Sequence, residues 1–153
     1  MAPAVHGNEL LLPVLGDFLT PSFFALYVLH TPRGEAEEGR YQSPAISRDE
    51  WDMFFDRFRQ YLAGDARFDL WLHSPADNAT LVWDRHNILY SYGPVETFEA
   101  ALGARGLIPG ELAIPDPHQH CYRSEFDSDA EALLTWFNWK RSPLRPEDEQ
   151  RVD

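Results

Sequence analysis

The chain has 153 residues, of which 44% are hydrophobic and 14% aromatic, a composition too apolar for a disordered protein. Its 25 acidic and 13 basic residues give a formal charge of −12, which repels nucleic acid phosphates and anionic membranes. We therefore expect a single domain, 1–153, that binds neither, with loose termini at 1–9 and 146–153.

The location of the protein is predicted by elimination. Cys121 is the only cysteine, so no intrachain disulfide is possible and a reducing compartment is favoured. The N-terminus has no basic segment followed by an apolar one, as a signal peptide would. The longest apolar run, 23–29, is far short of the roughly 20 residues of a membrane helix. We expect a soluble cytoplasmic protein, and the single lysine among the bases indicates a GC-rich, bacterial genome.

The N-terminal part of the chain predicts two strands followed by a loop. Residues 10–19 are apolar but interrupted by Pro13 and Gly16, which favours an edge strand or a short irregular segment. Residues 23–30 are continuously apolar, as in a strand covered on both faces. Residues 31–40 are polar and predict a solvated loop.

A helix is predicted to begin after Ser47 and to end at Gly64. Ser47 and Glu50 have the spacing of a capping box, in which each side chain accepts a hydrogen bond from the other residue's backbone N–H. Apolar residues then recur at helical spacing and define a buried face. That face consists of Trp51, Phe54, Phe55, Phe58 and Leu62.

Residues 67–92 predict three antiparallel strands, 67–74, 79–84 and 87–92, with a tight turn at 85–86. Side-chain alternation selects a register, because a slip of one residue moves every side chain to the other face. The predicted pairs are Leu72 with Leu81, Leu70 with Trp83, Trp83 with Ile88 and Leu81 with Tyr90. The core face would then consist of Leu70, Leu72, Leu81, Trp83, Ile88 and Tyr90.

Two further helices complete the predicted elements. One opens at Pro94 with Val95, Phe98 and Leu102 facing inward, and a short strand is expected near 111–114. The last helix starts with a second capping box at 128–131 and carries Lys140 and Arg141 at its end. The resulting order is β-β-α-β-β-β-α-(β)-α, an α+β fold with a mostly antiparallel sheet and helices packed chiefly on one face.

The first candidate site lies on the second face of the three-strand sheet. The predicted register places Asp69 opposite Asp84, beside a stripe that contains Trp71. Two carboxylates at this spacing repel unless a cation lies between them, so the pair predicts a docking site for a basic residue or, less favoured, a metal. The alternative is that Asp84 belongs to the turn and points to water, while a helix or the chain terminus covers the Trp71 stripe.

The second candidate site is a metal site at His118 and His120. In an extended segment these two side chains project to the same side and could ligate zinc or another divalent metal, with His30 or His73 as a further ligand. The alternative is a loop in which the histidines form local hydrogen bonds. Cys121 would point away from both histidines, and we expect it to be buried and unreactive.

The third candidate site is a second apolar stripe on the last helix. Trp136 and Trp139 lie beside its main face, so they are either buried or available to a partner. The sequence lacks the common nucleotide-binding and hydrolase motifs. These features favour an acidic, non-enzymatic module without a cofactor that binds a basic protein, as a bacterial inhibitor or antidote does. The alternatives are a metal-dependent hydrolase using His118 and His120, and a subunit that forms homo-oligomers through Trp136.

Overall fold

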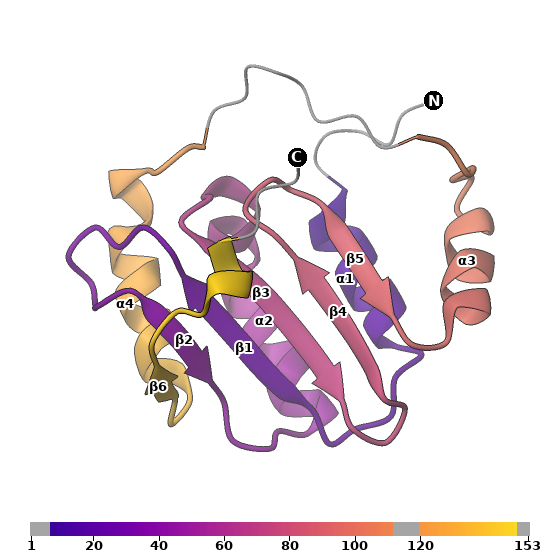
Figure 1. Ribbon diagram of the computed structural model, residues 1–153, viewed down its shortest axis with the longest axis horizontal. Coiled ribbons are helices and arrows are strands. Elements are labelled where there is room, and N and C mark those ends of the chain that lie inside the picture. The colour runs from indigo at the N-terminus through magenta and orange to yellow at the C-terminus, as the bar shows by residue number, and fades with distance from the viewer. Residues whose placement is uncertain (1–6, 112–119, 150–153) are drawn as a thin grey trace.

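The computed structural model describes residues 7–111 and 120–149. At its centre is a six-stranded antiparallel sheet with the strand order β5-β4-β3-β1-β2-β6 (Figure 1). The strands are β1 (Phe24–Leu29), β2 (Gly39–Gln42), β3 (Phe68–Ser74), β4 (Ala79–Trp83), β5 (Leu89–Tyr92) and β6 (Lys140–Ser142).

Helices pack chiefly on one face of this sheet, which confirms the predicted α+β fold class. The helices are α1 (Asn8–Gly16), α2 (Arg48–Gly64), α3 (Val95–Gly103) and α4 (Asp127–Trp136), with short 3-10 turns η1 (Ser124–Phe126) and η2 (Pro146–Glu149). In Figure 1, α1, α2 and α4 lie behind the sheet, α3 lies beside β5, and the yellow η2 turn lies in front. Among the described residues, no helix combines the length and apolarity needed to span a bilayer.

Helix α2 forms for the reasons that the sequence predicted. Ser47 Oγ accepts a hydrogen bond from the Glu50 N–H at 3.2 Å, and the Glu50 carboxylate accepts one from the Ser47 N–H at 2.7 Å. Together these satisfy two of the donors that every helix N-terminus leaves open. The whole predicted apolar face is buried against the sheet, and Tyr61 joins it.

The register of the first predicted hairpin is confirmed, and that of the second is wrong by one residue. Leu72 pairs with Leu81, but Trp83 pairs with Leu89 rather than with Ile88. The turn is one residue longer than expected, because Asn87 adopts a left-handed conformation (φ 63°) and its N–H bonds to the Asp84 carbonyl. The longer turn places Leu89 on the helix side of the sheet and Tyr90 and Tyr92 on the other side.

The N-terminal segment is a helix rather than the predicted strand. Leu12, Leu15 and Leu19 recur at helical spacing and are all buried. Pro13 lies inside α1 and lacks an N–H, but its carbonyl still accepts from the Asp17 N–H at 3.0 Å. Burial of one leucine stripe therefore outweighs the single missing backbone hydrogen bond. Asn8 and Glu9, expected in a loose terminus, begin this helix.

The end of the chain also differs from the prediction. Helix α4 stops at Trp136, and Lys140 and Arg141 lie in β6 instead of at a helix end. The helix stops because Phe137 turns to an extended backbone and the Trp139 indole N–H bonds back to the Leu133 carbonyl at 2.9 Å. The second capping box does not form, since α4 has no side-chain cap.

Smaller differences concern the predicted loop and the third helix. Strand β2 begins at Gly39, inside the segment predicted as a loop. Phe98 is buried as expected, but Val95 is 51% exposed. The strand expected near 111–114 lies almost wholly outside the described residues.

Candidate functional site

The face of the sheet opposite the helices carries a mixture of aromatic and polar side chains. In an antiparallel sheet, directly paired residues project to the same face, so the register defines three rows across it. The rows are Lys140, Gln42, Leu26, Trp71, Val82, Tyr90; then Phe24, His73, Thr80, Tyr92; then Ser142, Arg40, Val28, Asp69. We call these side chains the open face.

The open face is most exposed at β5, intermediate over β3 and β4, and most buried at β1. Tyr92 is 58% exposed, and Tyr90 and His73 are half-buried. Val28, by contrast, is fully buried although α1, α2 and α4 lie on the other side of the sheet. The segment 143–149, which includes η2, runs in front of the sheet at this point (Figure 1). An aromatic surface of this kind is typical of binding hot spots.

Asp69 lies near the start of β3 and Asp84 directly after β4, and the chain's own groups bind both carboxylates. Asp69 contacts His30 Nε2 at 2.8 Å and accepts the Arg85 N–H at 2.8 Å. Its side chain is only 14% exposed. It is therefore held in place rather than free to receive a ligand.

Asp84 belongs to the turn, as the alternative interpretation had it. Its Oδ1 accepts the backbone N–H groups of His86 and Ile88 at 3.0 and 2.9 Å, and its side chain is 12% exposed. Burial raises the pKa of the neighbouring Tyr90, and the charge of Asp84 raises it further. Asp84 is thus a turn-forming residue, and its removal would disturb β5.

Trp71, the third predicted contact, lies at the centre of the open face and is half-buried. The Arg40 guanidinium lies 5.5 Å from the centre of its ring, within the range of a cation–π contact. Arg40 also forms an ion pair with Asp148 of η2. The Trp71 indole Nε1 is buried and has no hydrogen-bond partner within the described part of the chain.

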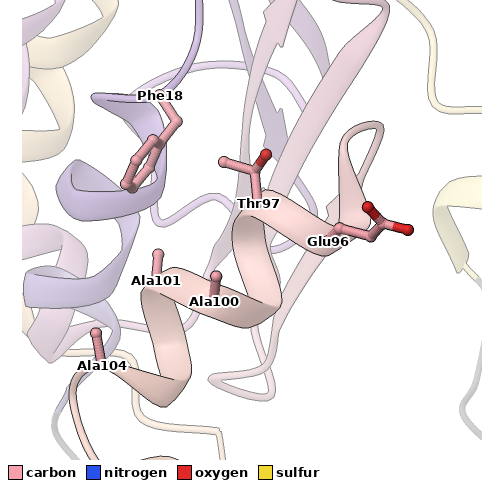
Figure 2. Close-up of a pocket in the computed structure, with 6 residues that line it drawn as sticks. All are labelled: Phe18, Glu96, Thr97, Ala100, Ala101 and Ala104. Carbon is pink, nitrogen blue, oxygen red and sulfur yellow. The ribbon is translucent and has the colours of Figure 1, made fainter.

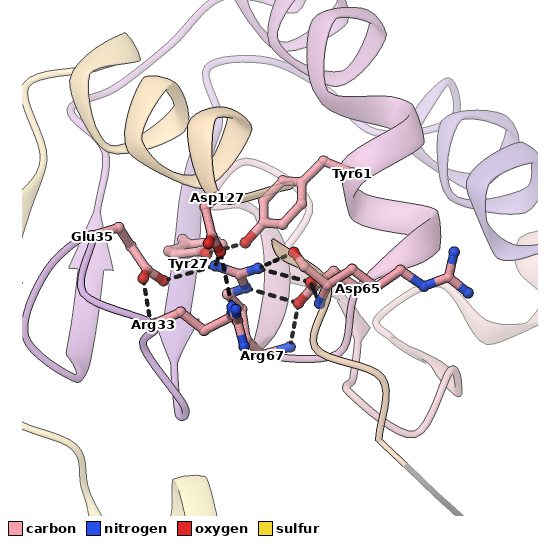
Figure 3. A network of polar contacts seen from close by, with 8 residues as sticks. Tyr27, Arg33, Glu35, Tyr61, Asp65, Arg67 and Asp127 are labelled. Atoms are coloured by element: carbon pink, nitrogen blue, oxygen red, sulfur yellow. Dashed lines mark hydrogen bonds and ion pairs between the residues drawn. The ribbon is translucent and has the colours of Figure 1, made fainter. Parts of the chain in front are cut away.

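A second polar cluster, absent from the predictions, surrounds Arg67 (Figure 3). Arg67 has no exposed surface, and its guanidinium donates two hydrogen bonds of 2.9 Å to the equally buried Asp65 carboxylate. It also contacts Glu35 at 3.4 Å and Asp127 at 3.1 Å. Asp65 follows α2, Glu35 lies in the loop after β1, and Asp127 begins α4. The cluster therefore joins three segments that are distant in sequence.

Two tyrosines extend this cluster into the core. The hydroxyls of Tyr27 and Tyr61 share a hydrogen bond of 2.7 Å. Burial is the main cause that raises the pKa of both tyrosines well above their ordinary value, so both are protonated at neutral pH. Since Arg67 is inaccessible to solvent, we interpret the cluster as a structural clamp. The only sequence signal for it is the Asp-x-Arg spacing directly after Gly64.

A groove of about 490 Å³ lies between α3 and Phe18, the second residue after α1 (Figure 2). It is lined by Phe18, Glu96, Thr97, Ala100, Ala101 and Ala104. Figure 2 shows Phe18 across from the alanines of α3. Its polar side chains are Glu96 and Thr97, and Figure 2 shows the Glu96 carboxylate pointing away from Phe18.

The predicted metal site cannot be placed as a whole, because His118 lies outside the described residues. His120 contacts His86, with ring centres 5.0 Å apart. The described residues contain no group of three or more His, Cys, Asp or Glu side chains that could hold a metal ion. Cys121 is exposed, so the prediction of a buried cysteine was wrong. The Cys121 carbonyl accepts a hydrogen bond from the Ala66 N–H, while the residue as a whole is exposed.

The two tryptophans of the predicted second stripe lie in different environments. Trp136, at the end of α4, is 40% exposed and packs its ring edge-on against Phe58. Trp139 lies beyond the helix and packs against Tyr27 and Phe54. Trp136 is therefore the more exposed of the two, and Trp139 is half-buried against the core.

Comparison of the chain with protein-family models, with curated proteins and with solved structures found no match.

Proposed function

We propose that this chain is a non-enzymatic binding module whose open face docks a basic protein. The observation that carries the proposal is the asymmetry of the sheet: helices cover one face, while the other presents Tyr92, Tyr90 and Trp71 around a partly buried centre. Tyrosine and tryptophan supply most of the binding energy at protein interfaces because they bury a large area at little entropic cost.

The charge of the chain supports a basic partner. At −12 the molecule attracts positively charged proteins and accelerates their encounter, whereas two copies of this chain repel each other. The carboxylates of Asp69 and Asp84 are engaged internally, so they set the local potential rather than forming direct ion pairs with the partner. An inhibitor or antidote of a basic bacterial enzyme in the cytoplasm fits this combination. The alternative of a metal-dependent hydrolase depends on His118, and no observation among the described residues favours it.

The proposal is tested by capture from a bacterial lysate with the immobilised protein and two variants. Tyr92→Ala removes the most exposed aromatic ring of the open face, and Met53→Ala removes an equally exposed apolar side chain (62%) from α2, on the helical side. We expect basic proteins to be captured by the wild type and by Met53→Ala and to be lost with Tyr92→Ala. Loss of one hot-spot tyrosine weakens binding by about 30-fold or more. Equal capture by both variants, or capture of acidic proteins only, would refute the proposal.

A further inference from the structure

The segment 143–149 runs in front of part of the open face (Figure 1). Val28, which pairs with Arg40 in the sheet, is fully buried, and the Asp148 side chain is only 2% exposed. Its connection to the sheet through charged groups is the ion pair between Asp148 and Arg40 of β2, whose side chain is 11% exposed. We call residues 143–149 the strap.

The Asp148 carboxylate both closes the η2 turn and attaches the strap to the sheet. Asp148 Oδ2 accepts the Arg145 N–H at 2.7 Å, and the Asp148 N–H donates to the Arg145 carbonyl at 2.9 Å, which closes the η2 turn. Asp148 Oδ1 bonds to Arg40. A cation that competes for this carboxylate therefore loosens the turn and its attachment together, because a charge-assisted hydrogen bond is the strongest contact the strap makes.

One buried hydrogen-bond donor near the strap has no acceptor among the described residues. The Arg40 guanidinium lies between Asp148 and the Trp71 ring, and the Trp71 indole N–H is buried without an acceptor among the described residues. A buried donor without a partner is unfavourable, and opening the strap would allow this N–H to reach water or an acceptor on another molecule. The strap thus covers a group that gains a hydrogen bond when it is uncovered.

We propose that the strap regulates the docking surface: a basic partner takes the Asp148 carboxylate from Arg40, displaces the strap and uncovers Trp71 and Val28. This inference rests on the proposed function, since it concerns access to the same face. It adds a specific order of events, in which the partner's cation acts on Asp148 before its apolar groups reach the centre of the sheet. In the free protein, Arg40 binds the Asp148 carboxylate that the partner's cation binds in the complex.

The strap itself is tested without a partner, by the solvent exchange of the tryptophan indole N–H groups in NMR spectra. Arg40→Gln removes the fastening cation and leaves Asp148 in place. Glu147→Gln, on the same turn, is the control for a change of one charge at an exposed side chain of the segment, and its change has the opposite sign to that of Arg40→Gln. We expect the Trp71 indole N–H, assigned with Trp71→Phe, to exchange about tenfold faster in Arg40→Gln and at the wild-type rate in Glu147→Gln. The Trp139 indole, which is bonded to the Leu133 carbonyl, should not change in either variant.

A second arm adds an eight-residue oligoarginine peptide as a basic probe. We expect binding of the probe to accelerate Trp71 indole exchange in the wild type and to leave the already rapid exchange of Arg40→Gln unchanged. If Arg40→Gln exchanges at the wild-type rate while the probe still binds, the strap is wrong and the docking function stands. If Arg40→Gln exchanges faster but neither protein binds the probe, the strap opens as described and the docking function is wrong. Acceleration in Glu147→Gln as well would mean that the segment opens after any substitution in it, not through loss of the ion pair, and would overturn the inference.

Discussion

Replacing Arg67 with alanine should destabilise the fold more than any exposed charge substitution. The variant removes every hydrogen bond that the guanidinium donates to Asp65, Glu35 and Asp127, and leaves two carboxylates with at most 1% exposed surface facing each other. Breaking a buried ion pair from one side costs about 3–5 kcal/mol, since the remaining charge is neither hydrated nor paired. That is a large fraction of the roughly 5–15 kcal/mol by which a domain of this kind is stable.

The assay is urea unfolding followed by tryptophan fluorescence, with the free energy of unfolding extrapolated to zero denaturant. Arg123→Ala is the control, because its side chain forms only an exposed pair with Glu125 (53% and 64% exposed) and its backbone contacts to the cluster remain. We expect a loss below about 1 kcal/mol for this control. Arg67→Met combined with Asp65→Asn should recover part of the loss, since it removes one of the two uncompensated buried charges and leaves that of Glu35. A loss for Arg67→Ala as small as that for Arg123→Ala would refute the interpretation of the cluster as a clamp.

Two more predictions concern the tyrosine pair and one glycine. Because burial raises the pKa of Tyr27 above its ordinary value of 10.0, the unfolded chain releases a proton above pH 10 that the folded chain retains, so stability is full below pH 10 and falls as the pH rises beyond it. Tyr27→Phe should lower the free energy of unfolding at pH 7 by about 1 kcal/mol, because the hydrogen bond to Tyr61 is lost. Between pH 10 and 11, however, its free energy of unfolding should fall less steeply with pH than that of the wild type. Urea titrations at several pH values measure both, and an equal fall with pH in the two proteins would contradict this. Gly93→Ala should cost about 2 kcal/mol or more, because φ is +124° and the new Cβ would lie 2.7 Å from Ala79 Cβ, whereas Gly103→Ala meets nothing within 4 Å and should be neutral or stabilising in the same thermal-unfolding assay.

Sequence reasoning predicted correctly those parts of the fold where the local sequence pattern is consistent with one structure only. The capping box at Ser47 and the helical spacing of five aromatic and aliphatic residues define α2 without reference to the rest of the chain. The first hairpin is similar, because a slip of one residue would separate Leu70 and Leu72 from the face that carries Leu81 and Trp83. The prediction of the helix-covered face therefore held wherever β3 and β4 determine it.

The elements that sequence reasoning placed wrongly depend on local contacts that the apolar pattern does not reveal. The length of the turn after Asp84 depends on a left-handed Asn87, and one added residue reversed the faces of Tyr90 and Leu89. Helix α4 resembles a longer helix in sequence, but it ends early, where the Trp139 indole N–H bonds to the Leu133 carbonyl six residues before it. Specific contacts of this kind override helix propensity.

The candidate site was predicted in part. Asp69 and Trp71 were placed on the face that the helices leave open, yet the internal partners of Asp69 are His30 and the backbone of Arg85, which no local pattern reveals. The pairing of Arg40 with Asp148 spans more than 100 residues and lay in segments predicted as a loop and a loose terminus.

The way the sheet ends at β6 has a consequence for the protein at high concentration. This outermost strand is only three residues long, carries the cations Lys140 and Arg141, and is followed directly by Pro143, which has no N–H to offer to an added strand. A neighbouring molecule that tried to continue the hydrogen-bond ladder would meet two fixed positive charges and then a missing donor. The β6 edge is thereby protected from fibril-like growth, which leaves β5 as the edge at which a further strand could add.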